Sequence, residues 1–235
     1  MTAAEVLKEL ETYGDVRTKN TLMNHGAREP FFGVKVGDMK KILKKTKKNH
    51  ELSLELYATG NSDAMYLAAL MADESQITEA QLDQWVDQAY WYYLYEFAVP
   101  WVAADTTFGF EMGLKWIESD QERIASAGWG ALASFAAVNQ DEMLDIEAYR
   151  GLLKRVEREI HTAQNRVRFT MNSFVIAIGG YVASLSTDAH DVAAKIGKVD
   201  VTLGSAACKV PLATEYIQKV CDRGSLGKKR KTARC

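Results

Sequence analysis

Aromatic side chains gather around a single carboxylate in the middle of the chain. Residues 88–101 read QAYWYYLYEFAVPW, and Glu96 is the only charged side chain among them. On a helix, residues four apart share a face, so Tyr92 and Glu96 would lie one turn apart. A ring face and a carboxylate both stabilise a nearby cation, including positive charge that develops during a reaction. The pair is therefore a candidate catalytic site.

Other large rings in and before this segment fit a packing role. Trp85, Trp91 and Phe97 are predicted to wedge neighbouring helices apart, because large aromatic side chains bury much apolar area. Pro100 is predicted near the C-terminal end of the same helix, where a proline ring disrupts the last turn. The segment thus predicts one two-sided helix over residues 88–104.

The composition is ordinary for a soluble globular protein. Apolar residues make up 47% and charged residues 26% of the 235 positions, enough for one sizeable core. No N-terminal stretch has the pattern of a signal peptide, and the apolar runs are too short to span a bilayer. Cys208, Cys221 and Cys235 have no metal-ligand spacing, and the histidines are scattered. We expect a monomer in the bacterial cytoplasm, without membrane, metal or cofactor.

Charge is divided unevenly along the chain. Residues 1–50 carry 11 Lys and Arg against 6 Asp and Glu, residues 51–147 carry 2 against 18, and residues 148–235 carry 16 against 7. The net charges of the three segments are therefore +5, −16 and +9. This division predicts a polyanion held by the two ends of the chain and repelled by the middle. The alternative is that each block is simply the solvated face of its helices.

Helical periodicity extends over nearly the whole chain. Apolar residues recur three and four positions apart, and no useful stretch alternates as a strand would. Short polar connections make consecutive helices antiparallel neighbours. Three successive helix pairs are predicted, at 62–73 with 79–90, 90–104 with 107–118, and 121–137 with 145–162. Each pair has the length of a degenerate helical repeat, so we predict an all-α, curved superhelical array whose concave face binds an extended partner.

Three segments, taken in order, resemble a known family. EPFFGVKVGDMKKILKK (29–45) resembles the N-terminal signature of the HEAT-like-repeat DNA alkylation repair family, the AlkD-like proteins: a Phe-Gly-Val-Lys turn that opens a basic helix. The helix predicted over 88–104 resembles the next marker, a Trp-rich segment with an acid one turn on. MNSFVIAIGGYV (171–182), after the basic NRVR (165–168), resembles the late core helix. The resemblance covers most of the chain, from about residue 28 to the tail.

The resemblance implies a horseshoe of helical repeats that holds duplex DNA in a basic concave face. Family enzymes hydrolyse the N-glycosidic bond of cationic alkylated purines without drawing the base into a deep pocket, unlike base-flipping glycosylases. Aromatic rings and one aspartate approach the sugar instead. Cleavage builds positive charge on the deoxyribose, which a carboxylate and ring faces stabilise, and the carboxylate can orient the attacking water.

Two registers carry the family pattern onto this sequence. The pattern is a tryptophan, an aspartate four residues later, and a proline four residues after that. Alignment on Pro100 puts Glu96 at the acid and Tyr92 at the ring, and we prefer it because it keeps both acid and proline. The other register puts Trp91 at the ring and Tyr95 at the acid, which would abolish the chemistry.

Two departures from the family pattern bear on catalysis. The family has an arginine where this chain reads SAGWGALASF (126–135), with Arg123 the nearest basic residue. The family also has a second tryptophan where Gly179 and Gly180 stand, although Tyr181 is a candidate substitute. Phosphate contacts need only positioned cations and are less affected.

The C-terminal stretch GSLGKKRKTARC (224–235) has glycines and cations but no apolar stripe. We expect residues 1–223 to form one HEAT-like helical-repeat domain and residues 224–235 a flexible basic tail. Candidate phosphate contacts lie in the basic N-terminal helix, the NRVR segment and this tail: Lys35, Lys40, Lys41, Lys44, Lys45, Arg166, Arg168, Lys228, Lys229, Arg230 and Lys231.

Three hypotheses follow from the sequence. The first is a DNA N-glycosylase for alkylated bases, with Glu96 as stabilising and water-positioning group and Tyr92 or Trp91 facing the sugar. The second is a non-catalytic relative that binds damaged or branched double-stranded DNA by its shape. The third is a helical-repeat scaffold for another protein, contacted through the acidic middle. Binding through many phosphates weakens steeply with salt, which separates the first two from the third.

Overall fold

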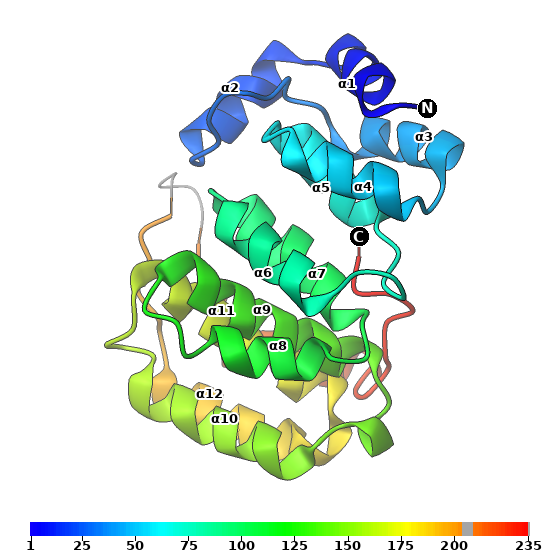
Figure 1. The fold of residues 1–235 in the computed structure, drawn as a ribbon. Coiled ribbons are helices and arrows are strands. Elements are labelled where there is room, and N and C mark those ends of the chain that lie inside the picture. The colour runs from blue at the N-terminus through cyan, green and yellow to red at the C-terminus, as the bar shows by residue number, and fades with distance from the viewer. Residues whose placement is uncertain (204–208, 235) are drawn as a thin grey trace.

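The computed structural model describes residues 1–203 and 209–234, and all regular elements in these ranges are helical. The predicted all-α array of HEAT-like helix pairs is confirmed (Figure 1). In chain order the elements are α1 (Ala3–Thr12), α2 (Val16–Asn24), α3 (Val36–Thr46), α4 (His50–Ala58), α5 (Ser62–Met71), α6 (Glu79–Gln88), the π-helix η1 (Tyr93–Ala98), α7 (Val99–Ala104), α8 (Gly109–Trp116), α9 (Glu122–Val138), η2 (Asp141–Met143), α10 (Ile146–Glu159), α11 (Asn165–Tyr181), η3 (Ala183–Leu185), α12 (Ser186–Ile196) and α13 (Ala213–Asp222).

Local signals in the sequence set the helix starts. The hydroxyls of Thr2 before α1 and Thr78 before α6 accept from the backbone N–H three residues on, and the side chains of Glu5 and Gln81 at those positions accept from the backbone N–H of the threonines. These capping boxes satisfy backbone N–H groups that the first helical turn leaves without partners. Asn61 similarly accepts from two N–H groups at the start of α5.

The helices predicted in the middle of the chain are found as α5 and α6, η1 with α7 and α8, and α9 and α10. The pairing differs from the prediction, because α5 packs closely on α4 and α9 on α8, rather than α5 on α6 and α9 on α10. Two buried apolar clusters run through the stack, one beneath α1 to α9 and the other beneath α8 to α13. α9 contributes Ala127 and Ala131 to the first cluster and Trp129 and Leu132 to the second. The long helices α9 and α11 pack most extensively on each other. α9 also packs on α7 and α8, and α11 on α12 and α13, so the two helices connect the earlier and the later part of the stack.

The C-terminal residues are packed along the stack, which corrects the expectation of a flexible tail. The backbone of Gly227 donates to Gly180 of α11, and that of Arg230 donates to Ala137 of α9. Arg234 is buried and its Nη1 donates to the carbonyl of Ala72 at the end of α5. We call the segment 225–234 the C-terminal strap, seen in red along the side of the stack (Figure 1). Charged side chains at the last carbonyls of helices offset the helix dipole, which explains how a stretch without an apolar stripe is held.

No single helix in the described part of the chain is long and apolar enough to cross a membrane; α11 and the helix after it pass that test only together, across a bend of 115°. Cys221 is a half-buried free thiol. Cys208 and Cys235 lie outside the described residues.

Candidate functional site

The aromatic segment is wound as a π-helix. In η1 the N–H of Val99 donates to the carbonyl of Leu94, five residues back. The chain is extended at Ala89 (φ −67°, ψ 101°), where α6 has ended, before it winds again. The helix predicted over 88–104 is therefore wrong over residues 89–91, which are not helical, and in its winding: η1 is a wider π-turn that runs directly into α7. Such π-turns are rare and frequently lie at functional sites.

Pro100 accounts for the position of this turn. It lies in the first two residues of α7, and the helix continues to Ala104. A proline has no N–H, and its ring crowds the carbonyl four residues back, here that of Glu96. A wider turn before the proline relieves the crowding. Pro100 was predicted to disrupt the last turn of a helix; it lies instead where η1 passes into α7, and the helix continues to Ala104.

Glu96 is buried and engaged by Arg166 of α11. Nε of Arg166 donates to Oε1 of Glu96 and Nη2 donates to Oε2, both at 2.6 Å. The Glu96 side chain is 1% exposed and that of Arg166 is 14% exposed. Burial raises the pKa of the Glu96 carboxyl to about 7, against the opposing hydrogen bonds and charge of Arg166. At neutral pH the site holds either a neutral acid or a carboxylate balanced by the guanidinium, and neither is an uncompensated anion.

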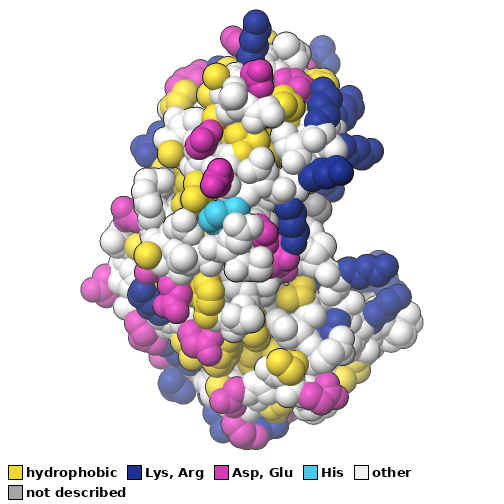
Figure 2. Space-filling model, turned by 45° about the vertical axis from the view of Figure 1, so that its right-hand side comes forward, with side chains coloured by type: hydrophobic (Ala, Val, Ile, Leu, Met, Phe, Trp, Pro, Cys, Tyr) yellow, Lys and Arg dark blue, Asp and Glu magenta, His cyan; other side chains and the backbone are white. Residues whose placement is uncertain are grey.

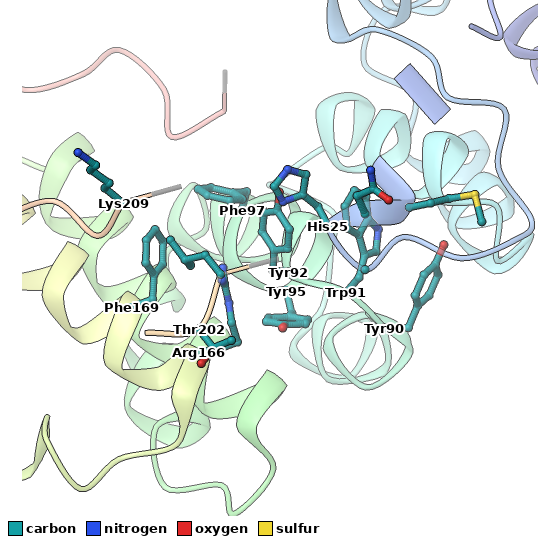
Figure 3. A pocket seen from close by; sticks show the side chains of 14 residues that line it. His25, Tyr90, Trp91, Tyr92, Tyr95, Phe97, Arg166, Phe169, Thr202 and Lys209 are labelled. Carbon is teal, nitrogen blue, oxygen red and sulfur yellow. The ribbon is translucent and has the colours of Figure 1, made fainter. Parts of the chain in front are cut away.

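Arg166 also connects Glu96 to the aromatic rings. Its guanidinium carbon lies 4.7 Å from the ring centroid of Tyr92 and 4.9 Å from that of Phe169, a cation–π geometry (Figure 3). Tyr92 and Glu96 are therefore brought together, as the first register predicts, but around an arginine. The charge of Arg166, predicted to contact phosphate, is turned towards Glu96.

The sequence marks the position of Arg166 as unusual but does not reveal its partner. The residue lies in the first turn of α11, where the helix dipole disfavours a cation. Its own N–H donates to Oε1 of Glu122 at 2.8 Å, so an acid from α9 serves the helix start instead. The carboxylate that the guanidinium pairs with lies 70 residues earlier, which no local pattern reveals.

Gly130 of α9 lies where the sequence lacks the family arginine. A Cβ at this position would be 3.0 Å from the carbonyl oxygen of Glu96 and 3.2 Å from Cγ of Pro100. α9 therefore approaches η1 too closely for a longer side chain to be placed there without displacement. Arg123 does not substitute, because its Nη2 pairs with Asp87 at 2.8 Å and its Nη1 donates to the end of α6.

α13 fills the place of the second tryptophan. A Cβ on Gly179 would lie 2.5 Å from Cδ1 of Ile217, and one on Gly180 would lie 3.5 Å from Val220. The glycines thus allow α13 to pack on α11. Tyr181 is half-buried at the end of α11, on the wall of the smaller of the two cavities beside Glu96.

Two cavities adjoin the Glu96–Arg166 pair. The smaller, about 230 Å³, is lined by Glu96, Phe97, Phe169, Tyr181 and Arg230, among others. The larger, about 720 Å³, has Arg166 in its wall between aromatic side chains of η1 and α11 (Figure 3). Phe97 and Phe169 line both, so they form the partition between the two spaces.

Of the three rings predicted to pack between helices, two are buried and one is not. Trp85 and Trp91 are buried, and the indole N–H of Trp91 donates to Oγ of Ser62 at 2.8 Å. Phe97, predicted as a core wedge, is instead half-buried between the cavities. Tyr95, the acid position of the second register, is buried, and burial raises the pKa of its hydroxyl.

The Phe-Gly-Val-Lys turn is built around a carboxylate that the sequence did not single out. Asp63 of α5 accepts hydrogen bonds from the backbone N–H groups of Phe32, Gly33 and Val34, at 2.6 to 3.2 Å. Gly33 has a φ of +80°, which favours glycine. The turn ends at Lys35, which is exposed at the start of α3.

The candidate phosphate contacts divide into engaged and exposed cations. Lys41 pairs with Asp38, Lys45 with Glu9 and Lys229 with Asp141, while Arg168 donates to the carbonyls of Ala163 and Asp200. Six others are exposed and make no ion pair within the described ranges: Lys35, Lys40, Lys44, Lys228, Arg230 and Lys231. Figure 2 shows Lys and Arg side chains gathered above and below a hollow at the edge of the molecule.

Similar proteins cover the same length of chain. The Listeria monocytogenes protein Lmo0209 is 33% identical over 221 residues, which span 92% of this chain and 95% of the relative. The Listeria innocua protein Lin0241 is 32% identical over the same shares. A solved structure from a new family of proteins related to the HEAT-like repeat DNA glycosylases, with affinity for branched DNA structures, superposes with a TM-score of 0.92 at 38% identity. The superposition covers 100% of both chains.

The sequence profile of the DNA alkylation repair enzyme family matches residues 6–191, from α1 into α12. The match includes the turn held by Asp63, the π-helix with Glu96 and the arginine that engages it. The chain therefore belongs to the DNA alkylation repair enzyme family.

Proposed function

We propose that this chain binds branched DNA by its shape and does not excise bases. The observation that carries the proposal is that both carboxylate oxygens of Glu96 accept from Arg166 in a buried pair. Stabilising the positive charge of N-glycosidic cleavage requires a negative group aimed at the sugar. A carboxyl that is 1% exposed and balanced by a guanidinium offers the sugar no such charge.

The exposed cations support the DNA-binding part of the proposal. Lys35, Lys40 and Lys44 lie on α3 or at its start, and Lys228 and Lys231 lie on the C-terminal strap. Cations on α3 and on the strap can contact separate phosphate backbones, and such contacts need no particular base. The relative of known structure has affinity for branched DNA, and its 38% identity over the full chain favours the same kind of ligand here.

Binding to a four-way junction and to a linear duplex of equal length tests the proposal. We expect tighter binding to the junction, with log K falling linearly as log salt concentration rises. Lys40→Ala should weaken binding to both DNAs and reduce the salt slope by about 0.9, because one phosphate contact is lost. Lys154→Ala, an exposed lysine of α10, is the matched control and should leave the slope unchanged. Equal affinity for junction and duplex would refute recognition of branching.

A further inference from the structure

The larger cavity is lined mainly by aromatic side chains, and the proposed function assigns it no ligand. Its volume of about 720 Å³ lies in the range of small-molecule sites, about 300–1,000 Å³. Six of the side chains that line it are aromatic: Tyr90, Trp91, Tyr92, Tyr95, Phe97 and Phe169. They come from the segment before η1, from η1 itself and from α11. Tyr92 and Phe169 lie against Arg166, and Tyr90 and Trp91 line the opposite side of the cavity (Figure 3).

Two of these rings, Tyr90 and Trp91, are held in place by contacts outside the cavity. The hydroxyl of Tyr90 donates to the carbonyl of Arg28 at 3.0 Å, and the guanidinium of Arg28 lies 4.6 Å from the Tyr90 ring centroid. Trp91 is fixed through its indole N–H to Ser62. A ligand that stacks on such rings binds walls whose side-chain entropy is already lost, which favours affinity.

The polar groups of the cavity suit a nucleotide. Lys209 supplies an exposed positive charge, and His25 and Thr202 supply groups that can hydrogen-bond the edge of a base. Aromatic faces combined with cations are the means by which proteins bind unpaired nucleotides, because every base has a face that stacks.

We infer that this cavity receives one unpaired nucleobase at the branch point of the DNA, with its phosphate near Lys209. The inference rests on the proposed function and concerns branch points that carry an unpaired base, because a base without a partner costs least to unstack. A base stacked in an intact duplex cannot reach rings recessed in this way. The cavity thus distinguishes a branch from a duplex by a contact that phosphates alone do not provide.

A pair of junctions isolates the contribution of the base. One three-way junction carries a single unpaired thymine at the branch, and the other carries an abasic residue there. We expect the full chain to bind the thymine junction about tenfold more tightly, the effect of one base stacking on aromatic side chains. Phe97→Leu and Phe169→Leu should each bring the ratio of the two dissociation constants close to one while keeping the affinity for the abasic junction. Tyr216→Leu, an exposed ring on α13, is the control and should keep the tenfold ratio.

Each outcome separates this inference from the proposed function. A ratio of one for the wild-type chain, with both junctions bound more tightly than duplex, would overturn the inference and leave the proposed function standing. Failure to bind either junction would overturn both. As a measurement that needs no variant, 5-iodouracil at the unpaired position should photo-crosslink the wild-type chain at Tyr92, Phe97 or Phe169, and crosslinks confined to peptides outside the cavity would overturn the inference.

Discussion

The charge and the pKa of the Glu96 carboxyl are set by burial and by Arg166. In the sequence it is a lone acid among rings, the composition of a site that stabilises cations. In the structure the cation is already present, since Arg166 contacts both carboxylate oxygens and lies against Tyr92. Burial and pairing have opposite effects on the carboxyl, and burial has the larger effect, so its pKa is raised to about 7.

The raised pKa of Glu96 predicts a pH dependence of stability. The ordinary value is 4.5, so between about pH 4.5 and 7 the folded chain holds a proton that the unfolded chain has released. This stabilising contribution is complete below that interval and is lost as pH rises through about 7. The free energy of unfolding by urea should therefore fall more steeply for the wild type than for Glu96→Gln between about pH 5 and 8. Parallel curves for the two proteins would show that Glu96 does not titrate in this way.

At the scale of elements, the site depends on how closely α9 approaches η1. The π-turn places the Glu96 carbonyl over Gly130, and the absence of a side chain there lets the two helices meet. The same contact holds Pro100, so the turn, the proline and the glycine form one packing unit.

Gly130→Ala should disturb this unit. The added Cβ would meet the Glu96 carbonyl oxygen at 3.0 Å, so η1 or α9 must shift, and we expect a loss of about 1–3 kcal/mol in the free energy of unfolding. Gly151→Ala is the matched control: it lies exposed in α10 with no atom within 4 Å of the added Cβ, and better helix propensity should stabilise the protein by up to about 1 kcal/mol. Thermal unfolding of both variants measures the difference. Equal melting temperatures would contradict the close-packing account.

The elements that could be predicted from the sequence are those that local patterns specify. Apolar spacing and capping residues predicted the helices α5 to α10, because each helix carries its own apolar stripe, but not which of them pack on each other. The π-turn could not be predicted, since it arises from the combination of Pro100 with packing against α9. The Glu96–Arg166 pair could not be predicted either, because the two residues are 70 positions apart and meet only because η1 and α11 both pack on α9. The register with Glu96 and Tyr92 did bring both residues to the same arginine, Arg166, although Glu96 lines the smaller cavity and Tyr92 the larger.

For the whole molecule, the uneven division of charge is partly neutralised inside the fold. Cations from the basic C-terminal third pair with acids of the middle: Arg166 with Glu96, Lys229 with Asp141, and Arg234 with Glu74 and Asp105. The C-terminal strap thus connects the second half of the stack to the end of α5 in the first. Of its cations, Lys228, Lys229, Arg230 and Lys231 were predicted to contact phosphate, and of these Lys229 instead reaches the carbonyl of Ala136 near the end of α9 and the carboxylate of Asp141.

Arg234→Ala should test the role of the strap. The change leaves the carbonyl of Ala72 and the carboxylates of Glu74 and Asp105 without their buried donor, which should lower the free energy of unfolding by about 1–3 kcal/mol. Lys228→Ala, an exposed lysine of the same strap, should change it by no more than about 0.5 kcal/mol. Urea unfolding compares them, and an equally small effect of both would mean that the strap does not stabilise the stack.

The most direct test of binding without excision is the release of free base from DNA that contains 7-methylguanine and 3-methyladenine. It should be measured at protein concentrations that saturate the DNA, for the wild type and for Glu96→Gln side by side. With Glu96 buried and balanced by Arg166, both proteins should release base at no more than the rate of the DNA alone. Release by the wild type that Glu96→Gln abolishes would contradict the account and establish Glu96 as a catalytic acid.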